Sequence, residues 1–369
     1  MRIVLTGGGT GGHLFPLIAV VSRIREKLGP EAEFLYIGSG QEMEKKAMAE
    51  AGIPSMFVLS GKMRRYFSFK NFVDIFKVPI GFLQSLWILL RFMPDAIFSK
   101  GGYVAVPVVL AAWVYRIPIL IHESDSIPGT ANQFLAKLAS RVAVAYPSAE
   151  DYFAKDKVAF TGNPVRFEVT EGDPIMLRTQ LGFTSAKKTL LILGGSQGSQ
   201  IINEAIIRIL PQLLHNFQII HQTGENNFKK VIAEAAYQGV KAGRDGYFVT
   251  PFMNANQLRD AFALCDLVVS RSGAAFIAEI AANEKPAILI PLEGSANDHQ
   301  RMNAYELAKI GAVLVLDEAN LGQHLLLEKI ENILADEKLS KQMAERIKTF
   351  YHPNAADTLA NGVIELARR

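Results

Sequence analysis

The feature that most constrains the fold is a pattern that occurs twice: a short apolar strand, a glycine loop and a helix. Residues 1–6 lead into Gly-Gly-Gly-Thr-Gly-Gly at 7–12 and then into a helical segment at 14–28. Residues 188–193 lead into Gly-Gly-Ser-Gln-Gly-Ser at 194–199 and then into a helical segment at 200–214. A strand that enters a helix through glycines is typical of Rossmann-like domains. The repeat predicts two such domains that face one cleft.

Short, nearly continuous apolar strands alternate with helical segments in both halves, which is typical of parallel sheets covered on both faces. The predicted strands are 2–5, 33–37, 56–59, 96–99, 118–122 and 142–146, then 189–193, 217–221, 247–250, 267–270 and 287–290. A turn at Gly162-Asn163-Pro164 separates the two sets. We therefore predict an α/β fold with domains at 1–163 and 164–340, and C-terminal helices at 341–369 that pack back on the first domain.

The length and composition agree with two globular domains. A chain of 369 residues exceeds the size of an ordinary single core. One cysteine, Cys265, excludes an internal disulfide framework and indicates a reducing compartment. The N-terminus has no basic segment followed by an apolar one, so we expect no export signal, and no uncharged run reaches the ~20 residues of a spanning helix.

Charge is distributed unevenly between the halves. Residues 1–163 hold 18 Lys and Arg against 13 Asp and Glu, a net +5, whereas residues 164–369 carry −2. The basic half contains the segment Lys62–Arg91, which is rich in aromatic residues and predicts an apolar helical face at 72, 75, 76, 79, 82 and 83, bent or interrupted at Pro79 and Gly81. Core packing is one interpretation of this face, and docking on an anionic membrane is the other. No basic run is interleaved with stacking aromatics on a recognisable module, so we expect no nucleic acid partner.

The first glycine loop is followed directly by His13, at the start of a helix. One interpretation is a histidine that caps local backbone; the other is a general base kept neutral by the positive helix end. An NAD-type oxidoreductase is disfavoured because the second strand ends in Tyr36-Ile37-Gly38, without the carboxylate that would hold a ribose.

The second half carries groups suited to a nucleoside diphosphate. Ser196 lies in the second glycine loop, Arg166 follows the turn between the halves, and Glu279 lies inside the helix that follows Arg271-Ser272-Gly273. Arg166 and Glu279 also have ordinary surface interpretations. The chain has no Asp-x-Asp and its histidines are scattered, so we predict no metal and no other cofactor; helix ends, hydroxyls and an arginine would stabilise a leaving diphosphate.

Together these segments resemble the MurG family of glycosyltransferases over essentially the full length. The motifs that carry the resemblance are GGGTGGH at 7–13, SGKMRRYF at 60–67, KGGY at 100–103, HESDSIPG at 122–129, GNPVR at 162–166, GGSQGS at 194–199, RSGA at 271–274 and DHQ…NA at 298–304. The resemblance implies a GT-B fold and inverting transfer of N-acetylglucosamine (GlcNAc) from UDP-GlcNAc to lipid I, the undecaprenyl-linked MurNAc-pentapeptide, at its C4 hydroxyl. The product would be lipid II, for peptidoglycan synthesis.

Matched onto this sequence, the resemblance implies roles for individual residues. His13 would be the catalytic base, and Tyr103 and Asp125 would bind the acceptor, although an ionised Asp125 accepts hydrogen bonds without donating them. The implied UDP-GlcNAc residues are Thr10, Gly11, Gly12, Arg166, Ser196, Met253, Ala274, Ala275, Glu279 and Gln300. The implied location is peripheral, on the cytoplasmic face of the cell membrane, with contacts to other wall-synthesis proteins left open.

Three alternative functions are also compatible with parts of this pattern. A diacylglycerol glycosyltransferase of related fold shares a membrane acceptor but is not expected to combine HESDSIPG with GGGTGGH. A non-hydrolysing UDP-GlcNAc 2-epimerase shares the two-domain fold and needs no acceptor. A catalytically silent membrane-recruiting subunit would not be expected to retain the ligand motifs of both halves.

Overall fold

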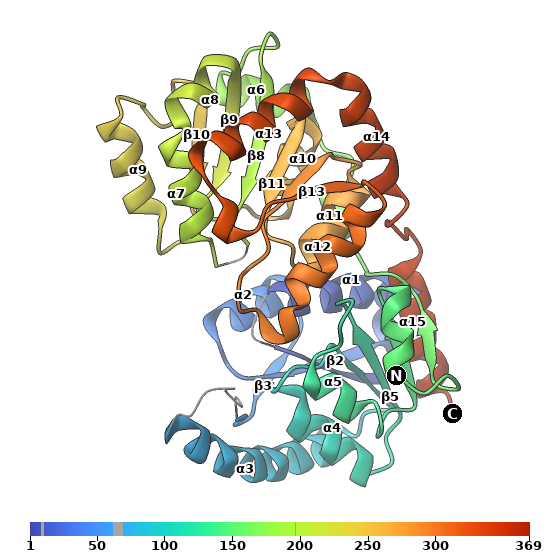
Figure 1. The fold of residues 1–369 in the computed structure, drawn as a ribbon. Helices are drawn as coiled ribbons and strands as arrows, with labels where there is room; N and C mark the ends of the chain where they lie inside the picture. Colours follow the sequence, from blue (N-terminus) through green and yellow to red (C-terminus); the bar gives the residue numbers. More distant parts are fainter. Residues whose placement is uncertain (9–10, 62–68, 196) are drawn as a thin grey trace. The chain divides into compact units, whose positions relative to one another are not determined.

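The computed structural model describes residues 1–8, 11–61, 69–195 and 197–369. The chain divides into two compact units, the first formed by residues 1–165 and 352–369 and the second by residues 166–351. Each unit is a parallel sheet with helices packed on it (Figure 1). The first crossing between units therefore lies two residues after the predicted boundary at 163, and the return lies at 351–352.

Among the described residues, seven parallel strands form the sheet of the first unit, in the order β3-β2-β1-β4-β5-β6-β7. Their bounds are β1 Arg2–Thr6, β2 Glu33–Gly38, β3 Ser55–Phe57, β4 Ala96–Ser99, β5 Ile119–Glu123, β6 Arg141–Val144 and β7 Val158–Phe160. The helices of this unit are α1 Gly11–Leu28, α2 Glu42–Glu50, α3 Phe69–Phe92, α4 Ala105–Val114, α5 Thr130–Leu135 and α15 Ala355–Ala367. Strand order reverses direction between β1 and β4, so the loops after these two strands lie at the topological switch point.

Six parallel strands in the described part of the second unit follow the order β10-β9-β8-β11-β12-β13. Their bounds are β8 Lys188–Leu193, β9 Phe217–Gln222, β10 Tyr247–Thr250, β11 Leu267–Ser270, β12 Ala287–Leu289 and β13 Val313–Val315. The helices are α6 Pro174–Leu181, α7 Gln200–Arg208, α8 Leu210–Asn216, α9 Phe228–Tyr237, α10 Ala255–Leu264, α11 Ala274–Ala282, α12 His299–Lys309, α13 Gln323–Ala335 and α14 Glu337–Lys348. Here the switch point lies between β8 and β11.

The two cores follow the strand alternation. In the first unit, Ile3 and Leu5 of β1 join Phe98 of β4 and the inward faces of α1 and α15. In the second, Leu190 and Ile192 of β8 join residues of α7, α8 and α13. The final helix α15 packs on α1, β4 and β5, which returns the C-terminus to the first unit.

The C-terminal segment differs from the prediction in one respect. We expected residues 341–369 to pack back on the first domain, but α14 packs on α11 and α13 and belongs to the second unit. Buried Met343 of α14 is part of the second core, and this packing holds the helix there.

Helix α3 runs through Pro79 and Gly81 without a break among the described residues. A Cβ added at Gly81 would overlap the carbonyl oxygen of Leu59, so glycine permits the preceding loop to lie against the helix. The backbone N–H of Leu59 also donates to Oε1 of Gln84, at 2.8 Å. Glycine at position 81 therefore permits the close approach of the loop at Leu59 to the helix. The expected interruption at Pro79 and Gly81 does not occur.

Candidate functional site

The loops that follow β1 and β4 fit closely against each other. Gly7 has φ +143°, and a Cβ added there would lie 2.8 Å from Cβ of Lys100. The N–H of Lys100 donates to the carbonyl oxygen of Thr6 at 2.8 Å. Glycine at position 7 is therefore required both by the backbone conformation and by the contact with the second loop.

His13 is half-buried in the first turn of α1, beside this pair of loops. Its Nδ1 lies 2.7 Å from the carbonyl oxygen of Gly8. Because a carbonyl only accepts, Nδ1 carries the proton in the neutral ring and Nε2 carries the lone pair. A Cβ added at Gly102 would lie 3.6 Å from Cε1 of the ring, so the loop after β4 passes next to it. This tautomer suits a general base. Of the other loop residues that the sequence singled out, Gly11 and Gly12 begin α1, and Thr10 lies outside the described residues.

Tyr103 and Asp125 follow neighbouring strands, β4 and β5, at the same edge of the sheet. The Tyr103 hydroxyl accepts a hydrogen bond from Nε2 of Gln41 at 3.3 Å. The N–H of Asp125 donates to Oε1 of Glu123 at 3.0 Å. Both side chains are half-buried, which is compatible with contact to a ligand at this edge.

Beneath these loops lies a buried polar cluster that the sequence analysis did not identify. The Lys100 ammonium contacts Nδ1 of His122 and Oγ of Ser124, and Ser124 donates to Oδ1 of Asn163 at 3.4 Å. Nε2 of His122 donates to the carbonyl oxygen of Gly162 at 3.0 Å, so Nδ1 is the acceptor for the lysine. Burial lowers the pKa of Lys100 to about 7 and, together with the lysine charge, holds the pKa of His122 well below its usual range. The cluster anchors the loop after β4.

Glu123, the last residue of β5, organises the loop that carries Asp125. Besides the bond from Asp125, its Oε2 accepts from the N–H of Gly129 at 3.1 Å and from Nδ2 of Asn132 at 2.9 Å. Burial, then the neighbouring Asp125 charge, raises the pKa of Glu123 to about 7. The KGGY motif follows β4, and the HESDSIPG motif begins with the last two residues of β5. Because these two strands pair, their adjacency is the signal that would have connected Lys100 with His122.

At the switch point of the second unit, the glycine loop after β8 packs closely against the loop after β9. Gly195 and Gly198 have φ of +91° and +79°, and a Cβ at Gly198 would overlap the carbonyl oxygen of Thr223. Ser199 caps α7 by accepting from the N–H of Ile202 at 3.3 Å. Ser196 lies outside the described residues, so its predicted contact with a phosphate stays a prediction.

The structure brings together two residues that the sequence assigned to the same ligand. Nη2 of Arg166 lies 2.9 Å from Oε1 of Glu279, 113 positions away in the chain, and both side chains are largely buried. Glu279 lies in α11, and Ala274 and Ala275 form the first turn of that helix after its N-cap Gly273. A guanidinium and a carboxylate next to a helix N-terminus are suited to a phosphate and a ribose hydroxyl, respectively.

Met253 and Gln300 each form hydrogen bonds in which one partner is a backbone group. The N–H of buried Met253 donates to Oε1 of Gln222 at 3.0 Å, so this N–H already has a protein partner. Gln300 lies in the first turn of α12, where its Oε1 accepts from the N–H of Leu292 at 3.1 Å. The carbonyl oxygen of Gln300 accepts from Oγ of Ser272 at 2.8 Å, which ties α12 to the loop before α11.

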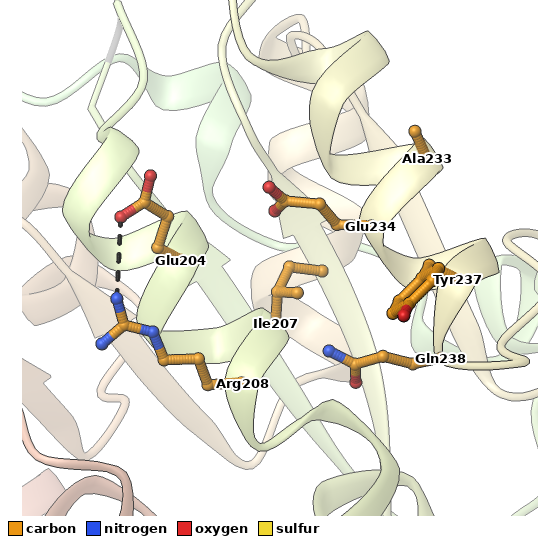
Figure 2. A pocket seen from close by; sticks show the side chains of 7 residues that line it. All are labelled: Glu204, Ile207, Arg208, Ala233, Glu234, Tyr237 and Gln238. Carbon is orange, nitrogen blue, oxygen red and sulfur yellow. Dashed lines mark ion pairs between the residues drawn. The ribbon is translucent and has the colours of Figure 1, made fainter.

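A separate hollow of about 520 Å³ lies between α7 and α9 (Figure 2). Its lining includes no residue that the sequence assigned to a ligand; it comprises Glu204, Ile207, Arg208, Ala233, Glu234, Tyr237 and Gln238. Figure 2 shows the ion pair between Glu204 and Arg208, at 3.9 Å, on its rim. Within the described ranges no group of three His, Cys, Asp or Glu is arranged to hold a metal ion. No helix in the described part of the chain is long and apolar enough to cross a membrane.

Comparison with known proteins decides the family. Residues 3–144 match the N-terminal domain of glycosyltransferase family 28, and residues 189–359 match its C-terminal domain. The chain is 38% identical over 367 residues to the Bacillus licheniformis UDP-N-acetylglucosamine–N-acetylmuramyl-(pentapeptide) pyrophosphoryl-undecaprenol N-acetylglucosamine transferase, with 99% of each chain covered. The Bacillus subtilis enzyme of the same name is 36% identical over 369 residues, with all of each chain covered. The chain belongs to the MurG family of glycosyltransferases.

Solved structures agree with this assignment. MurG of Acinetobacter baumannii superposes with a TM-score of 0.74 at 25% identity, over 99% of both chains. A UDP-GlcNAc 2-epimerase from Neisseria meningitidis gives a TM-score of 0.69 at 13% identity, which shows a shared fold alone. The predictions of family and of an α/β fold with two Rossmann-like domains are confirmed. The roles of individual MurG-type residues stay predictions.

Proposed function

We propose that this chain transfers GlcNAc from UDP-GlcNAc to the C4 hydroxyl of undecaprenyl-diphospho-MurNAc-pentapeptide, forming the lipid-linked disaccharide used for peptidoglycan. The observation that carries the proposal is full-length identity to transferases named for that reaction, 38% over 367 residues. The transfer inverts the anomeric centre, because one in-line displacement converts the α-linked donor into a β-linked product.

In this proposal His13 takes the proton from the acceptor hydroxyl as that oxygen attacks C1 of GlcNAc. The support is the hydrogen bond from Nδ1 to Gly8, which leaves Nε2 as the proton acceptor. Tyr103 and Asp125 contribute to the acceptor side, at the same sheet edge. We assign Thr10, Gly11 and Gly12 to the binding of UDP-GlcNAc.

The second unit holds the donor. Glu279 accepts the ribose hydroxyls, while Arg166, Ser196 and the N-terminus of α11 at Ala274 and Ala275 stabilise the diphosphate as UDP leaves. Met253 contacts the uracil through its backbone; since its N–H is bonded to Gln222, we assign this contact to its carbonyl oxygen. Gln300 contacts the GlcNAc hydroxyls.

The proposed reaction needs no metal and no other cofactor, because an arginine, hydroxyls and helix N-termini supply the positive potential. We expect activity to persist in excess EDTA. Loss of activity in EDTA that Mg²⁺ or Mn²⁺ restores would contradict this part of the proposal.

We also propose that the first unit docks peripherally on the cytoplasmic face of the membrane through the segment 62–91, because the acceptor's lipid stays in the bilayer. Side chains of residues 62–76 lie outside the description, but the rest of α3 exposes large apolar residues at helical spacing: Ile80, Leu83, Trp87 and Leu90. Leu83 is 64% exposed and Trp87 is 53% exposed, with the Arg91 guanidinium 4.9 Å from the Trp87 ring centroid. Trp113, Val114 and Tyr115 at the end of α4, which packs on α3, are exposed as well.

A substrate panel tests the function against its alternatives. The enzyme would be offered UDP-GlcNAc or UDP-glucose with lipid I, with diacylglycerol or without an acceptor, and both UDP release and the remaining sugar nucleotide would be measured. We expect release only with UDP-GlcNAc and lipid I together. Transfer to diacylglycerol would favour the related lipid glycosyltransferase, and formation of UDP-ManNAc without an acceptor would favour the epimerase.

A further inference from the structure

Gln222, the last residue of β9, connects two loops that lie on either side of it. Its side chain is buried, with 2% exposure. Nε2 donates to the carbonyl oxygen of Gly195 at 3.3 Å, and Oε1 accepts from the N–H of Met253 at 3.0 Å. One amide thus joins the glycine loop after β8 to the turn after β10.

The backbone around Gln222 brings the same loops together. The N–H of Thr223 donates to the carbonyl oxygen of Thr250, and that of Gly224 donates to Pro251, both at 3.0 Å. On the other side, a Cβ added at Gly224 would lie 2.5 Å from the carbonyl oxygen of Gln197. The chain from Gln222 to Gly224 is therefore a spacer between the two loops, and its only long side chain bonds to both.

We propose that Gln222 is a positioning residue that fixes the distance between the diphosphate-binding loop and the base-binding turn. The inference rests on the proposed donor site, in which the glycine loop meets the diphosphate and Met253 meets the uracil. A nucleoside diphosphate that is bound in one conformation presents its base and its phosphates at one separation. Only a side chain with one donor and one acceptor can hold both loops at that separation, and an amide supplies this pair without introducing a charge beside the phosphates.

Gln218 provides a matched control. It lies on the same face of β9, four residues earlier, and is also 2% exposed. Its amide makes three hydrogen bonds to backbone, with Thr184 at 2.5 and 2.9 Å and with Lys187 at 3.1 Å. These bonds lie at the amino end of the strand, opposite the proposed donor site.

The test compares UDP and uridine binding by calorimetry in wild type, Gln222→Met and Gln218→Met. We expect Gln222→Met to lose about tenfold or more in UDP affinity, and to lose most of the advantage of UDP over uridine, because its two subsites no longer match one ligand. The donor KM should rise while kcat and the acceptor KM change less than threefold. Gln218→Met should keep the wild-type ratio of UDP to uridine affinity even where its Tm falls further.

If Gln222→Met does not fold, Gln222→Asn replaces it, because it keeps a buried amide that is one methylene too short to reach both loops; the same loss is expected. A folded Gln222 variant with the wild-type ratio of UDP to uridine affinity would overturn the inference. Wild type that binds neither UDP nor uridine would instead overturn the proposed function itself.

Discussion

The two units share strand order and the strand–glycine loop–helix beginning, yet they differ in what they expose and in what they bury. The first unit concentrates exposed apolar side chains on α3 and the end of α4, whereas those of the second unit, such as Ile175, Ile201 and Tyr237, lie on separate helices. Under its loops the first unit buries a lysine, a histidine and a glutamate, whereas beside its glycine loop the second unit buries the neutral amides of Gln222 and Asn203 together with the guanidinium of Arg271.

Under the proposed assignment of acceptor and donor, this difference adapts one topology to two ligands. A concentrated apolar surface of this kind is typical of an interaction site, whereas scattered apolar residues are ordinary. Uncharged amides next to a glycine loop leave the potential of the helix ends undiminished for a phosphate. Substitutions in one unit should therefore change the function assigned to that unit and leave the function assigned to the other unit intact.

The largest effect is expected from the first unit. His13→Ala should lower turnover by ~10²–10⁴-fold, because the acceptor hydroxyl loses its base, while UDP affinity stays near wild type. Steady-state kinetics and UDP calorimetry measure both. His215→Ala, at an exposed histidine of the second unit, is the control and should change neither. Near-normal turnover in His13→Ala would contradict the assignment of His13 as the catalytic base.

The counterpart in the second unit is Glu279→Ala. Loss of hydrogen bonds to the ribose hydroxyls should raise the donor KM by about 10- to 100-fold while the acceptor KM stays constant. Asp260→Ala, which breaks a partly buried ion pair with Arg259 at 2.8 Å in the same unit, controls for lost stability and should leave the donor KM unchanged. A rise in the acceptor KM alone would mean that the two units have been assigned to the wrong substrates.

A third experiment addresses the exposed faces. A Leu83/Trp87/Leu90→Ser variant should bind anionic vesicles about tenfold more weakly than wild type in sedimentation assays, because three apolar side chains leave the interface. Ile175/Tyr237→Ser in the second unit is the matched control and should bind as wild type does. Equal vesicle binding by a folded α3 variant would locate the docking surface elsewhere.

The smallest effect concerns pH and the second unit. Burial lowers the pKa of His221 to about 3 from 6.5, and its ring lies between the Tyr247 hydroxyl and Oδ1 of Asn203, at 2.9 and 3.0 Å. The His221 ring takes up a proton more readily in the unfolded chain than in the folded one. Its contribution to the free energy of unfolding is therefore complete above pH 6.5 and is lost as the pH falls toward 3. The slope is at most about 1.4 kcal/mol per pH unit. Urea unfolding from pH 7 to 4 should show a shallower loss in His221→Gln than in wild type; an unchanged slope would contradict the assignment.

Much of the fold followed from the sequence, because long buried strands carry their own pattern. The predicted strands agree with β1–β6 and β8–β12 to within one or two residues. Strands β7 and β13 were not predicted, although the equally short strands β3 and β12 were. The helix predicted at 200–214 divides at Ile209, whose φ of −112° and ψ of 8° separate α7 from α8 just before Pro211.

The sequence predicted residues of the candidate site, but it did not predict which of them contact each other. Arg166 and Glu279 were singled out separately, and only the fold shows them to be an ion pair. The buried contact of Lys100 with His122 depends on the adjacency of β4 and β5, and the bridge through Gln222 depends on where β9 ends between two loops. Such contacts join residues that are distant in sequence, and a periodic pattern of apolar residues does not reveal which distant residues meet.

The central claim is the transfer reaction, and its most direct test is mass analysis of the lipid fraction after incubation with UDP-GlcNAc and lipid I. We expect a lipid product heavier than lipid I by one N-acetylhexosamine, formed with an equal amount of UDP, and formed ~10²–10⁴-fold more slowly by His13→Ala. An unchanged lipid I fraction after incubation with folded wild-type enzyme and UDP-GlcNAc would contradict it.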